Sequence, residues 1–377
     1  MKKIGITGQA GFVGNHLFTT LSLDENIELI PFERSFFLDD KKLETFISSC
    51  DVIVHLAAMN RHEDANVIYN TNIGLVEKLI SACENKKATP HIIFSSSSQE
   101  LNDNLYGKSK KEGKEKFMNW AEKNDGKFTS LTIPNVFGPF GKPNYNSFIA
   151  TFCHKIANGE DPTILNDAEV GLIYINELVA VITDVIYNKA DAKTLNKNSN
   201  QLDVKPKHYK KVSETLNLLK RYKVDYMENG IFPNLDSAFE KALFNTFRCY
   251  VPQDHYPVKF TKHTDPRGSF VEIARTQTSG QFSFSTTVPG ITRGNHFHTR
   301  KAERFAVISG KALIQLRKIG TDEVIDYYLD GNEPAYVDMP IWYTHNIKNI
   351  GEEELITLFW INEPYNPDDA DTYFENV

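Results

Sequence analysis

Two different patterns of apolar and polar residues follow one another along the chain. From residue 1 to about 190, short apolar runs typical of buried strands alternate with segments whose apolar residues recur at helical spacing. The strand-like runs are KKIGIT, IELIPF, DVIVHLAA, HIIFSSSS and SLTIPNVFG. The helix-like segments include FVGNHLFTTLSL, the residues from Asn72 to Cys83, and residues 107–123. This alternation predicts an α/β fold with a Rossmann-type, doubly wound parallel sheet and helices on both faces.

The pattern changes near residue 250. A lysine- and asparagine-rich stretch at residues 192–207 interrupts the alternation, and two further helical segments extend to about Phe247. From Val258 on, short segments alternate apolar and polar residues and are separated by turn residues, which is typical of an all-β sandwich or barrel. We therefore expect two domains, residues 1–249 and residues 250–377.

Composition narrows the class of protein. An apolar content of 41% and a charged content of 24% are ordinary for a soluble globular protein. The net charge of -7 argues against a broad nucleic-acid surface, and no apolar run approaches the length of about 18 residues that a membrane span needs. The cysteines lie far apart without a CxxC pair, which favours reduced thiols. We expect a cytoplasmic protein that binds neither nucleic acid nor a membrane.

A glycine loop directly follows the first predicted strand. Gly8, Gly11 and Gly14 have the spacing GxxGxxG and open a predicted helix. Such a loop lets the backbone approach a pyrophosphate, and the helix directs its first N–H groups at the anion. An ordinary glycine turn is the alternative, but the strand–loop–helix context favours dinucleotide binding.

The loop spacing resembles that of the extended short-chain dehydrogenase/reductases. The run from Asp51 to Ala58, Asn72 and the YxxxK pair in Tyr106-Gly-Lys-Ser-Lys110 support this resemblance, as does the serine run from Ser95 to Ser98. The resemblance implies a nicotinamide cofactor. For His55, which the resemblance places near the cofactor, a purely structural role is the alternative. The implied cofactor-binding residues are Gly8, Gly11, Phe12, Val13, Gly14, Arg34, His55, Leu56, Ala57, Ala58, Asn72, Tyr106 and Lys110.

The expected chemistry explains the catalytic residue types. Hydride transfer to a ketone leaves negative charge on oxygen, and a tyrosine can supply the proton if a nearby ammonium lowers its pKa. Lys110 lies one helical turn from Tyr106, on the same face. A serine hydroxyl, which we assign to Ser97 by its position, would hold the carbonyl oxygen. Only nine residues separate Ser97 from Tyr106, so the loop between them must be tight.

The cofactor and sugar pockets can also be placed. At the end of the second strand Arg34 would suit a 2′-phosphate whereas Glu33 argues for NAD, and we favour NADPH. The extended reductases build their nucleotide-sugar pocket from segments that correspond to Asn135 and to the run from Lys142 to Ser147. We therefore expect substrate contacts from Asn135, Lys142, Asn144, Tyr145 and Asn146, with a polar surface loop as the alternative for the second segment.

The C-terminal region carries a second signature. Gly290-x5-His296-x-His298-x4-Glu303-x6-Gly310, followed by Pro340 and His345, resembles the cupin pattern, which implies a double-stranded β-helix. Strand alternation places His296 and His298 on one face, and the resemblance brings Glu303 and His345 beside them. Three imidazoles and a carboxylate suit zinc or another divalent ion, with a metal-free barrel as the alternative. Trp342 stands where cupins usually have glycine.

The same region is similar to the dTDP-4-keto-6-deoxyhexose epimerases, a cupin family. Asp265-Pro-Arg267-Gly268 and Arg293-Gly294-Asn-His296-Phe carry this similarity. It implies substrate contacts from Arg267 and Arg293, with His296 as the base and Tyr343 as a candidate acid. Those epimerases have HFQ where this chain has HFH, so His296 is a metal ligand, a base, or each in different states.

Taken whole, the chain resembles bifunctional reductase/epimerases of capsular polysaccharide synthesis. YGKSK, NVFG, KPNYNS, IATFCHKIANGE and DTYFENV carry the resemblance together with the cupin histidines. It implies a homodimer that acts on a UDP-2-acetamido-2,6-dideoxy-hexos-4-ulose. The cupin domain would epimerise C3, and the reductase domain would reduce C4 with NADPH. The product would be UDP-2-acetamido-2,6-dideoxy-L-talose, on the route to UDP-N-acetyl-L-fucosamine for capsular or O-antigen polysaccharide.

Two narrower functions remain as alternatives. The first is a 4-keto-sugar reductase whose cupin domain only binds metal and stabilises the dimer. The second is a nucleotide-sugar-binding protein with an inactive reductase fold. The complete set of Ser97, Tyr106 and Lys110 argues against the second.

Overall fold

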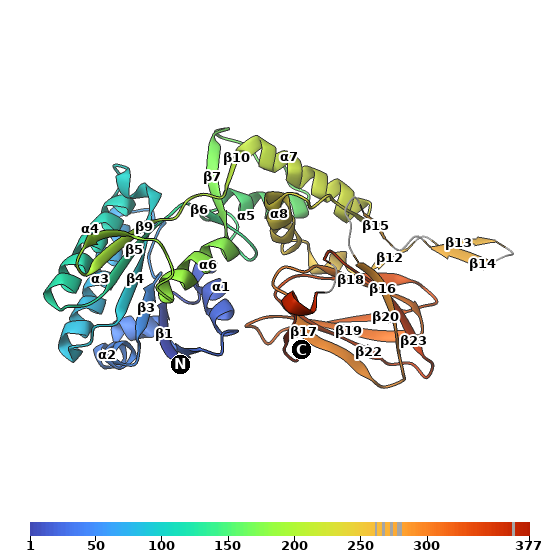
Figure 1. Cartoon of the computed structure of the whole chain (residues 1–377). Coiled ribbons are helices and arrows are strands. Elements are labelled where there is room, and N and C mark those ends of the chain that lie inside the picture. Colours follow the sequence, from blue (N-terminus) through green and yellow to red (C-terminus); the bar gives the residue numbers. More distant parts are fainter. Residues whose placement is uncertain (261, 266–267, 272–273, 277–280, 364–365) are drawn as a thin grey trace. The chain divides into compact units, whose positions relative to one another are not determined.

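The chain folds into two compact units. The structure is a computed structural model that describes residues 1–260, 262–265, 268–271, 274–276, 281–363 and 366–377 (Figure 1). One unit comprises Met1–Ser147 and Ala168–Lys211, and the other comprises Phe148–Asp167 and Val212–Val377. No described helix is long and apolar enough to cross a membrane.

A seven-stranded sheet forms the centre of the first unit. Its strand order is β2-β1-β3-β4-β5-β9-β8, and all its neighbouring pairs are parallel except β8 with β9. The chain moves outward from β1 to β2 and returns to β3, so the strand order reverses beside β1. The strands are β1 (Lys2–Thr7), β2 (Ile27–Ile30), β3 (Val52–His55), β4 (His91–Ser97), β5 (Phe128–Ile133), β8 (Lys193–Asn196) and β9 (Ser199–Asp203).

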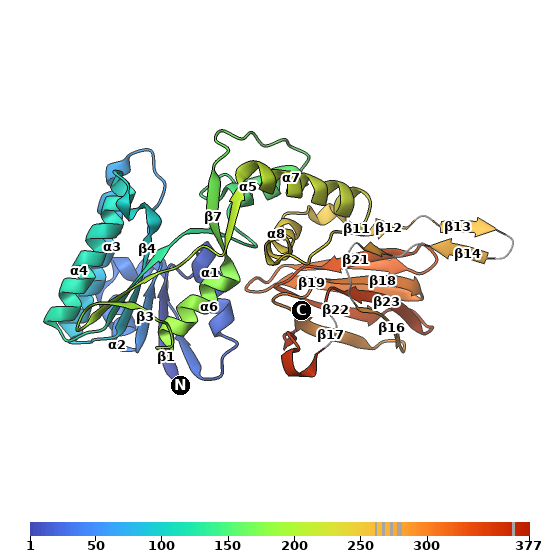
Figure 2. The same cartoon turned by 45° about the horizontal axis from the view of Figure 1, so that its top comes forward.

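Helices cover both faces of this sheet, as the alternating pattern predicts. Figure 2 shows α3 and α4 on one side and α1 and α6 on the other. On the first side, α2, α3 and α4 bury a core that includes Phe46, Leu79, Phe117 and Trp120. The Rossmann-type fold is thereby confirmed. The helices are α1 (Phe12–Leu21), η1 (Arg34–Leu38), α2 (Asp40–Ser48), α3 (Ala65–Lys86), η2 (Ser98–Leu101), α4 (Leu105–Lys123) and α6 (Ile175–Ile186).

Two parts of the first unit differ from the expectation. The run SLTIPNVFG forms two strands, because Pro134 lacks a backbone N–H and ends β5 before β6 (Asn135–Phe137) begins. The second strand joins a separate sheet of order β10-β7-β6, which contains β7 (Glu169–Tyr174) and β10 (His208–Lys211). The polar stretch at 192–207 does not interrupt the fold, since it contributes β8 and β9 to the main sheet.

The second unit contains an antiparallel barrel made from two five-stranded sheets. Their orders are β12-β21-β18-β23-β16 and β20-β19-β22-β17-β24 (Figure 1). The buried core includes Val307, Ile314, Leu316, Val337 and Ile347, which confirms the all-β prediction. The strands are β12 (Val258–Lys259), β16 (Gln281–Thr287), β17 (Thr292–Phe297), β18 (Glu303–Ser309), β19 (Lys311–Lys318), β20 (Val324–Asp330), β21 (Ala335–Met339), β22 (Tyr343–Asn349), β23 (Leu355–Ile361) and β24 (Tyr373–Phe374).

The helical segments before the barrel belong to the same compact unit. The predicted boundary near residue 250 lies at the end of α8, yet the packing groups the preceding helices with the barrel. The division into a reductase domain of residues 1–249 and an epimerase domain of residues 250–377 remains a prediction. The remaining elements are α5 (Phe148–Ala157), α7 (Val212–Tyr222), η3 (Lys223–Glu228), β11 (Ile231–Phe232), α8 (Ala238–Arg248), η4 (Gln253–His255), β13 (Lys262–Asp265), β14 (Gly268–Val271), β15 (Arg275–Thr276) and η5 (Pro367–Asp369).

A buried ion pair joins two strands of the barrel behind these helices. Arg304 in β18 donates to both carboxylate oxygens of Asp338 in β21, over 2.7 and 3.1 Å. Tyr226 of η3 also donates to Asp338, and Arg248 of α8 donates to the Met339 carbonyl at 3.1 Å. Both Arg304 and Asp338 are almost fully buried. The network therefore supplies the partners that a charge needs when it is removed from water.

We predict that Arg304→Met destabilises the barrel by about 3–5 kcal/mol, because it leaves the Asp338 carboxylate buried without its counter-ion. Urea unfolding of the full chain, followed by tryptophan fluorescence, measures the effect as a lower midpoint. Lys259→Ala is the control, since its pair with Glu333 is exposed and such pairs contribute at most about 1 kcal/mol. Equal midpoints for the two variants would contradict a structural role for the buried pair.

Candidate active site and metal centre

Close backbone packing gives the glycine loop its shape. Gly8 has a φ of +74°, a left-handed conformation that favours glycine. A Cβ atom on Gly14 would lie 2.2 Å from the Gly8 carbonyl oxygen, so only glycine allows α1 to approach the loop this closely. The helix begins at Phe12, and its cap residue Gly11 has no side chain to cover the first-turn amides. These N–H groups can bind an anion at the helix N-terminus.

A pocket of about 510 Å³ adjoins this loop. It lies where β1, β2 and β3 end, beside the point at which the strand order reverses, and this is the usual ligand position in open α/β sheets. Six of the predicted cofactor residues line it: Gly8, Gly11, Arg34, Leu56, Ala57 and Ala58. Tyr145, a predicted substrate contact, also lines it. The sequence analysis missed the other lining residues, which are Gln9, Ala10, Phe32, Phe37, Met59, Arg61, Thr71 and Leu75.

Two predicted cofactor residues do not line the pocket but form hydrogen bonds with residues beside it. His55 is buried, its Nδ1 lies 2.6 Å from Thr7 Oγ1, and burial lowers its pKa to about 3. It is therefore a neutral core histidine. Asn72 accepts a hydrogen bond from the Met59 amide at 2.7 Å and donates to the Met59 carbonyl at 2.9 Å, which fixes the loop after β3. Phe12, Val13 and Gly14 form the start of α1.

The predicted catalytic residues Ser97, Tyr106 and Lys110 come together at the end of β4 and the start of α4. Lys110 Nζ donates to the Ser95 carbonyl at 2.9 Å and lies 5.8 Å from the centroid of the Tyr106 ring. Burial lowers the pKa of Lys110 to about 8. The Ser97 side chain is close enough to Tyr106 to lower the pKa of its hydroxyl. Each neighbouring serine has a different partner, because Ser96 donates to Glu100 at 2.6 Å and Ser95 to the His55 carbonyl at 3.1 Å.

The pKa of Tyr106 differs from the expectation. Burial raises it, and this effect outweighs that of the Ser97 side chain, which lowers it. The Lys110 ammonium, which is expected to lower this pKa, donates to the Ser95 carbonyl at 2.9 Å. A raised pKa keeps the Tyr106 hydroxyl protonated at neutral pH, which suits a group that donates a proton.

A glycine accounts for the short connection between Ser97 and Tyr106. A Cβ atom on Gly107 would lie 2.1 Å from the carbonyl oxygen of Gln99 in η2. Asn104 caps α4 by accepting a hydrogen bond from the Gly107 amide at 2.7 Å. The tight loop that the short spacing requires is therefore built from a glycine contact and a helix cap.

The predicted sugar-binding loop contacts the loop that follows β3. Arg61 donates to the Asn144 carbonyl at 2.9 Å and to the Tyr145 carbonyl at 3.2 Å. The Tyr145 hydroxyl donates to Asn60, and Lys142 Nζ lies 5.4 Å from the Tyr145 ring centroid. Lys142, Asn144 and Tyr145 are thus brought to one edge of the cofactor pocket. Asn146 lies in the same loop, and Asn135 is exposed in β6.

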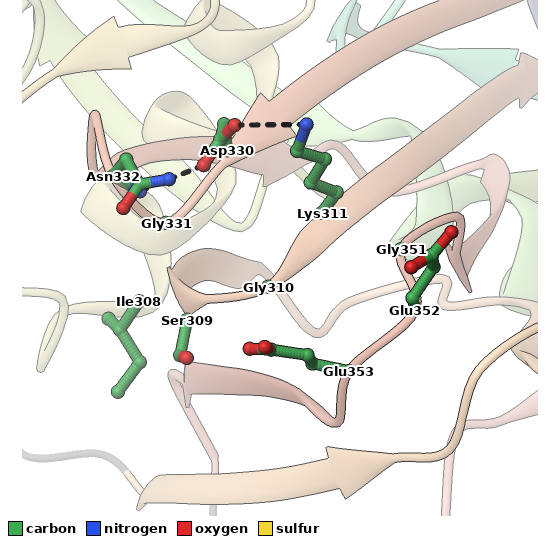
Figure 3. A pocket seen from close by; sticks show the side chains of 10 residues that line it. All are labelled: Ile308, Ser309, Gly310, Lys311, Asp330, Gly331, Asn332, Gly351, Glu352 and Glu353. Atoms are coloured by element: carbon green, nitrogen blue, oxygen red, sulfur yellow. Dashed lines mark hydrogen bonds and ion pairs between the residues drawn. The ribbon is translucent and has the colours of Figure 1, made fainter.

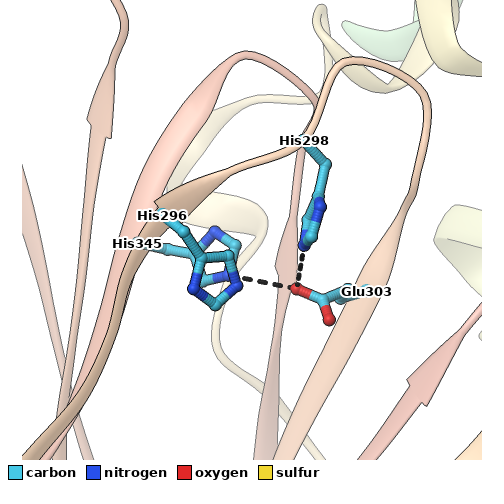
Figure 4. A group of neighbouring side chains, drawn as sticks. All are labelled: His296, His298, Glu303 and His345. Carbon is cyan, nitrogen blue, oxygen red and sulfur yellow. Dashed lines mark hydrogen bonds and ion pairs between the residues drawn. The ribbon is translucent and has the colours of Figure 1, made fainter. Parts of the chain in front are cut away.

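The four predicted metal ligands form one cluster in the barrel (Figure 4). The ligand atoms of His296, His298, Glu303 and His345 all lie within 4.8 Å of one another. Nε2 of His298 and Nε2 of His345 lie 3.1 and 3.0 Å from the same carboxylate oxygen of Glu303. The paired strands β17 and β22 place His296 opposite His345.

Electrostatics and hydrogen bonding suit a divalent cation in this cluster. Burial, with the two neighbouring histidines, lowers the pKa of His296 to about 4, so its ring is neutral and can coordinate. The pKa of Glu303 lies below its usual range, because both histidines outweigh the effect of burial. The buried Nε2 of His345 has no hydrogen bond of acceptable geometry. Zinc–nitrogen bonds of about 2.0–2.1 Å require ligand atoms at close to these separations.

Trp342 occupies the usual glycine position of the cupin pattern without changing its backbone. It has a φ of +60°, the left-handed conformation that glycine would adopt. The backbone N–H of Trp342 donates to the backbone carbonyl of His298 at 2.8 Å, and the indole ring stacks on Phe297 with centroids 5.6 Å apart. The departure from the pattern is therefore compensated by packing next to the metal ligands.

Three further predicted residues lie elsewhere or outside the described residues. Tyr343 begins β22, and its backbone carbonyl oxygen lies 3.3 Å from Nδ1 of His345. Burial raises the pKa of Tyr343, with further effects from Cys249, Tyr327 and Glu323. Arg293 is exposed and donates to the Thr286 carbonyl at 3.1 Å. Arg267 lies outside the described residues.

A second hollow of about 240 Å³ lies where the barrel strands end away from the histidine cluster (Figure 3). Turns at Gly310, Gly331 and Gly351 enclose it, and Lys311 pairs with Asp330 across 3.8 Å. It contains none of the predicted site residues.

The fold and the two sites define a class of protein. A Rossmann-type unit with a pocket beside a glycine loop and a Ser–Tyr–Lys set is joined to a unit whose barrel carries a cluster suited to metal. Residues 4–197 match the NAD dependent epimerase/dehydratase family, and residues 263–373 match the Polysaccharide biosynthesis C-terminal domain. The chain belongs to the NAD dependent epimerase/dehydratase family, with that second domain at its C-terminus.

Two relatives match this chain over nearly its full length, and a third matches a part of it. A Pseudomonas aeruginosa protein named UDP-2-acetamido-2,6-beta-L-arabino-hexul-4-ose reductase is 34% identical over 376 residues, which cover 98% of each chain. The crystal structure of the capsular polysaccharide assembling protein CapF from Staphylococcus aureus is 34% identical and covers 100% of both chains, with a TM-score of 0.62. The Bacillus subtilis spore coat polysaccharide biosynthesis protein SpsL is 28% identical over 123 residues, 30% of this chain and 82% of SpsL. The predicted resemblance to proteins of capsular polysaccharide synthesis is thereby confirmed.

We predict that Gly14→Ala weakens NADPH binding by at least about 10-fold, because the new methyl group would displace the Gly8 carbonyl and open the loop. Fluorescence titration with NADPH measures the affinity. Gly74→Ala in α3 is the matched control, since no atom lies within 4 Å of its added Cβ. Unchanged binding by Gly14→Ala would show that the cofactor does not approach this loop.

Proposed function

We propose that this chain is a bifunctional nucleotide-sugar enzyme. Its first unit reduces the 4-keto group of a UDP-2-acetamido-2,6-dideoxy-hexos-4-ulose with NADPH, and its barrel epimerises C3 of the same sugar. The product is UDP-2-acetamido-2,6-dideoxy-L-talose, a precursor of N-acetyl-L-fucosamine units in capsular or O-antigen polysaccharide. The observation that carries the reductase proposal is the convergence of Ser97, Tyr106 and Lys110 within the unit that holds the glycine-loop pocket.

The reduction uses residues with distinct tasks. Ser97 would donate a hydrogen bond to the C4 carbonyl oxygen, and NADPH, when bound, would supply the hydride that C4 accepts and become NADP⁺. Tyr106 gives its hydroxyl proton to the resulting alkoxide, and its raised pKa keeps that proton in place until charge develops. Lys110 would bond the nicotinamide ribose, and its ammonium is positioned by the hydrogen bond that it donates to the Ser95 carbonyl at 2.9 Å.

The name of the Pseudomonas relative supports the substrate class. That protein is called a reductase of a UDP-linked hexul-4-ose, and it matches this chain from end to end. Lys142, Asn144, Tyr145 and Asn146 would bind the sugar nucleotide, with Asn135. Arg34 lines the cofactor pocket, whereas the carboxylate of Glu33 accepts a hydrogen bond from Ser35 at 3.0 Å. An arginine here favours a 2′-phosphate, so the proposed cofactor is NADPH.

The barrel is proposed to act on carbon C3. The 4-ketone acidifies the adjacent C–H, a base removes that proton to leave an enolate, and a proton returns to the opposite face. His296, the least buried member of the cluster, is the proposed base, and Tyr343 is retained as the candidate acid. His296, His298, Glu303 and His345 would hold one divalent ion, which we propose to be zinc, and His296 would act as the base only in a state in which it does not coordinate that ion. Such an ion supplies Lewis-acid stabilisation of an oxyanion when bound.

The remaining expectations complete the proposal. Arg267 and Arg293 would contact the UDP-sugar at the barrel. The protein would function in the cytoplasm as a homodimer. Its small-molecule substrate would be the UDP-linked 4-keto-6-deoxy amino sugar. The alternative is a 4-keto-sugar reductase whose barrel binds metal and stabilises the dimer without catalysis.

We predict that the full-length protein exchanges the C3 proton of a UDP-4-keto-6-deoxy-HexNAc in D2O without NADPH, because enolisation at C3 requires no reductant. Proton NMR of the sugar follows the exchange, and later addition of NADPH should yield the reduced sugar. Tyr106→Phe should lower the reduction rate by about 100-fold or more while leaving C3 exchange intact. His296→Asn should abolish exchange and leave reduction of the ketone in place.

The outcomes distinguish the proposal from its alternatives. A C3 signal that persists while NADPH is consumed supports a plain 4-ketoreductase with a structural barrel. Reduction at the wild-type rate by Tyr106→Phe would overturn the assignment of the catalytic tyrosine. If the protein neither exchanges the C3 proton nor consumes NADPH, the result would support a nucleotide-sugar-binding protein without catalytic activity.

A further inference from the structure

The segment at the C-terminus packs against the turn that joins two metal-ligand strands. Asp371 lies between η5 and β24, and it is 5% exposed. One of its carboxylate oxygens accepts hydrogen bonds from the Thr299 amide and hydroxyl, at 3.1 and 2.6 Å. The other accepts from the amides of Arg300 and Lys301, at 3.0 and 3.1 Å. Residues 299–301 follow the ligand His298 and precede the ligand Glu303, so one buried carboxylate organises the connection between them.

The backbone of the same residue contacts the ligand itself. The carbonyl oxygen of Asp371 lies 2.5 Å from His298 Nδ1. A carbonyl can only accept a hydrogen bond, so Nδ1 carries the proton and Nε2 is left to face Glu303. Metal-binding histidines usually donate their second ring N–H in this way, and the partner fixes both the tautomer and the ring orientation.

An uncommon backbone conformation allows both contacts at once. Asp371 has a φ of +45°, in the left-handed region that residues other than glycine seldom adopt. Contacts on both sides hold it there. Lys301 Nζ donates to the Ala370 carbonyl at 2.6 Å, and β24 pairs with β17 so that the Tyr373 ring stacks on Phe297 with centroids 5.4 Å apart.

We propose that Asp371 is a positioning residue for the metal centre. Its carboxylate holds the turn at residues 299–301, and its carbonyl sets the tautomer and direction of His298. Asp371 does not touch the ion. This inference rests on the proposed metal-binding function of the histidine cluster. It adds that the metal affinity of the cluster depends on Asp371.

The test compares Asp371→Asn with the wild-type full chain. The amide has nearly the same shape, but it replaces one acceptor oxygen with an NH2 group that repels the amides of Arg300 and Lys301. Zinc affinity is measured by competition with a chromophoric chelator, and the geometry by the visible spectrum of the cobalt(II)-loaded protein. We expect the zinc Kd to rise by about 10-fold or more and the cobalt bands to shift. Hydrogen exchange of the amides at 299–301 should accelerate in the metal-free variant.

Asp369→Asn is the matched control. That carboxylate lies two residues away, is 64% exposed and bonds the Arg300 guanidinium at 2.6 Å, so its loss should leave the zinc Kd within about twofold. If Asp371→Asn does not fold, Thr299→Val removes one hydrogen bond from the same carboxylate and should raise the Kd in the same direction by less.

Each outcome has one meaning. Wild-type affinity and an unshifted cobalt spectrum in Asp371→Asn, or in Thr299→Val where that variant replaces it, would overturn the positioning role and leave the metal centre standing. A wild-type protein that binds neither zinc nor cobalt at the cluster would refute the metal centre itself, and the positioning role with it. An equal loss of affinity in Asp369→Asn would also overturn the proposal, because it would show a general effect of charge in this segment.

Discussion

Hydrogen bonds between buried side chains and backbone atoms are the interactions on which both candidate sites depend. Lys110 is held by the Ser95 carbonyl, Asn72 by the amide and carbonyl of Met59, and His298 by the Asp371 carbonyl. A backbone atom at the end of a packed strand or turn cannot move without disturbing its element, so it fixes a side chain more firmly than a mobile side-chain partner would. Removing one partner leaves the other buried and unsatisfied, which makes these arrangements costly to disrupt. The same kind of hydrogen bond thus holds the proposed catalytic residues of the α/β unit and the histidine cluster of the barrel.

Much of this architecture could be predicted from the sequence, because the signals were local. The glycine spacing, the alternating runs and the YxxxK pair indicated the Rossmann-type unit, and the histidine pattern indicated the barrel and its four ligands. Strands β8 and β9 escaped prediction because their residues are mostly polar, and pairing with the rest of the sheet, not their own apolarity, makes them strands. Periodicity cannot report such pairing.

Other features depend on contacts between distant segments. Arg61 and Met59 joined the cofactor pocket through loop geometry that no short motif encodes. Asp371 meets the turn at residues 299–301 across about seventy positions of sequence. The lowered pKa expected for Tyr106 assumed that the neighbouring ammonium faces the hydroxyl, whereas the Ser95 carbonyl takes that ammonium in the folded chain. Trp342 stands where the cupin pattern usually has glycine, yet its backbone has a positive φ. A departure in the sequence therefore does not change the backbone conformation at this position.

The account makes one central claim, that two chemically separate centres in one chain act on the same 4-keto sugar. Mixing the Tyr106→Phe and His296→Asn proteins tests it most directly, because each variant lacks one centre and retains the other. In D2O with UDP-4-keto-6-deoxy-HexNAc and NADPH, the account predicts that the mixture forms the wild-type product, inverted and deuterated at C3 and reduced at C4, while neither protein alone does so. A mixture that yields only an alcohol with its original, protonated C3 would contradict the claim and confine the chemistry to the reductase.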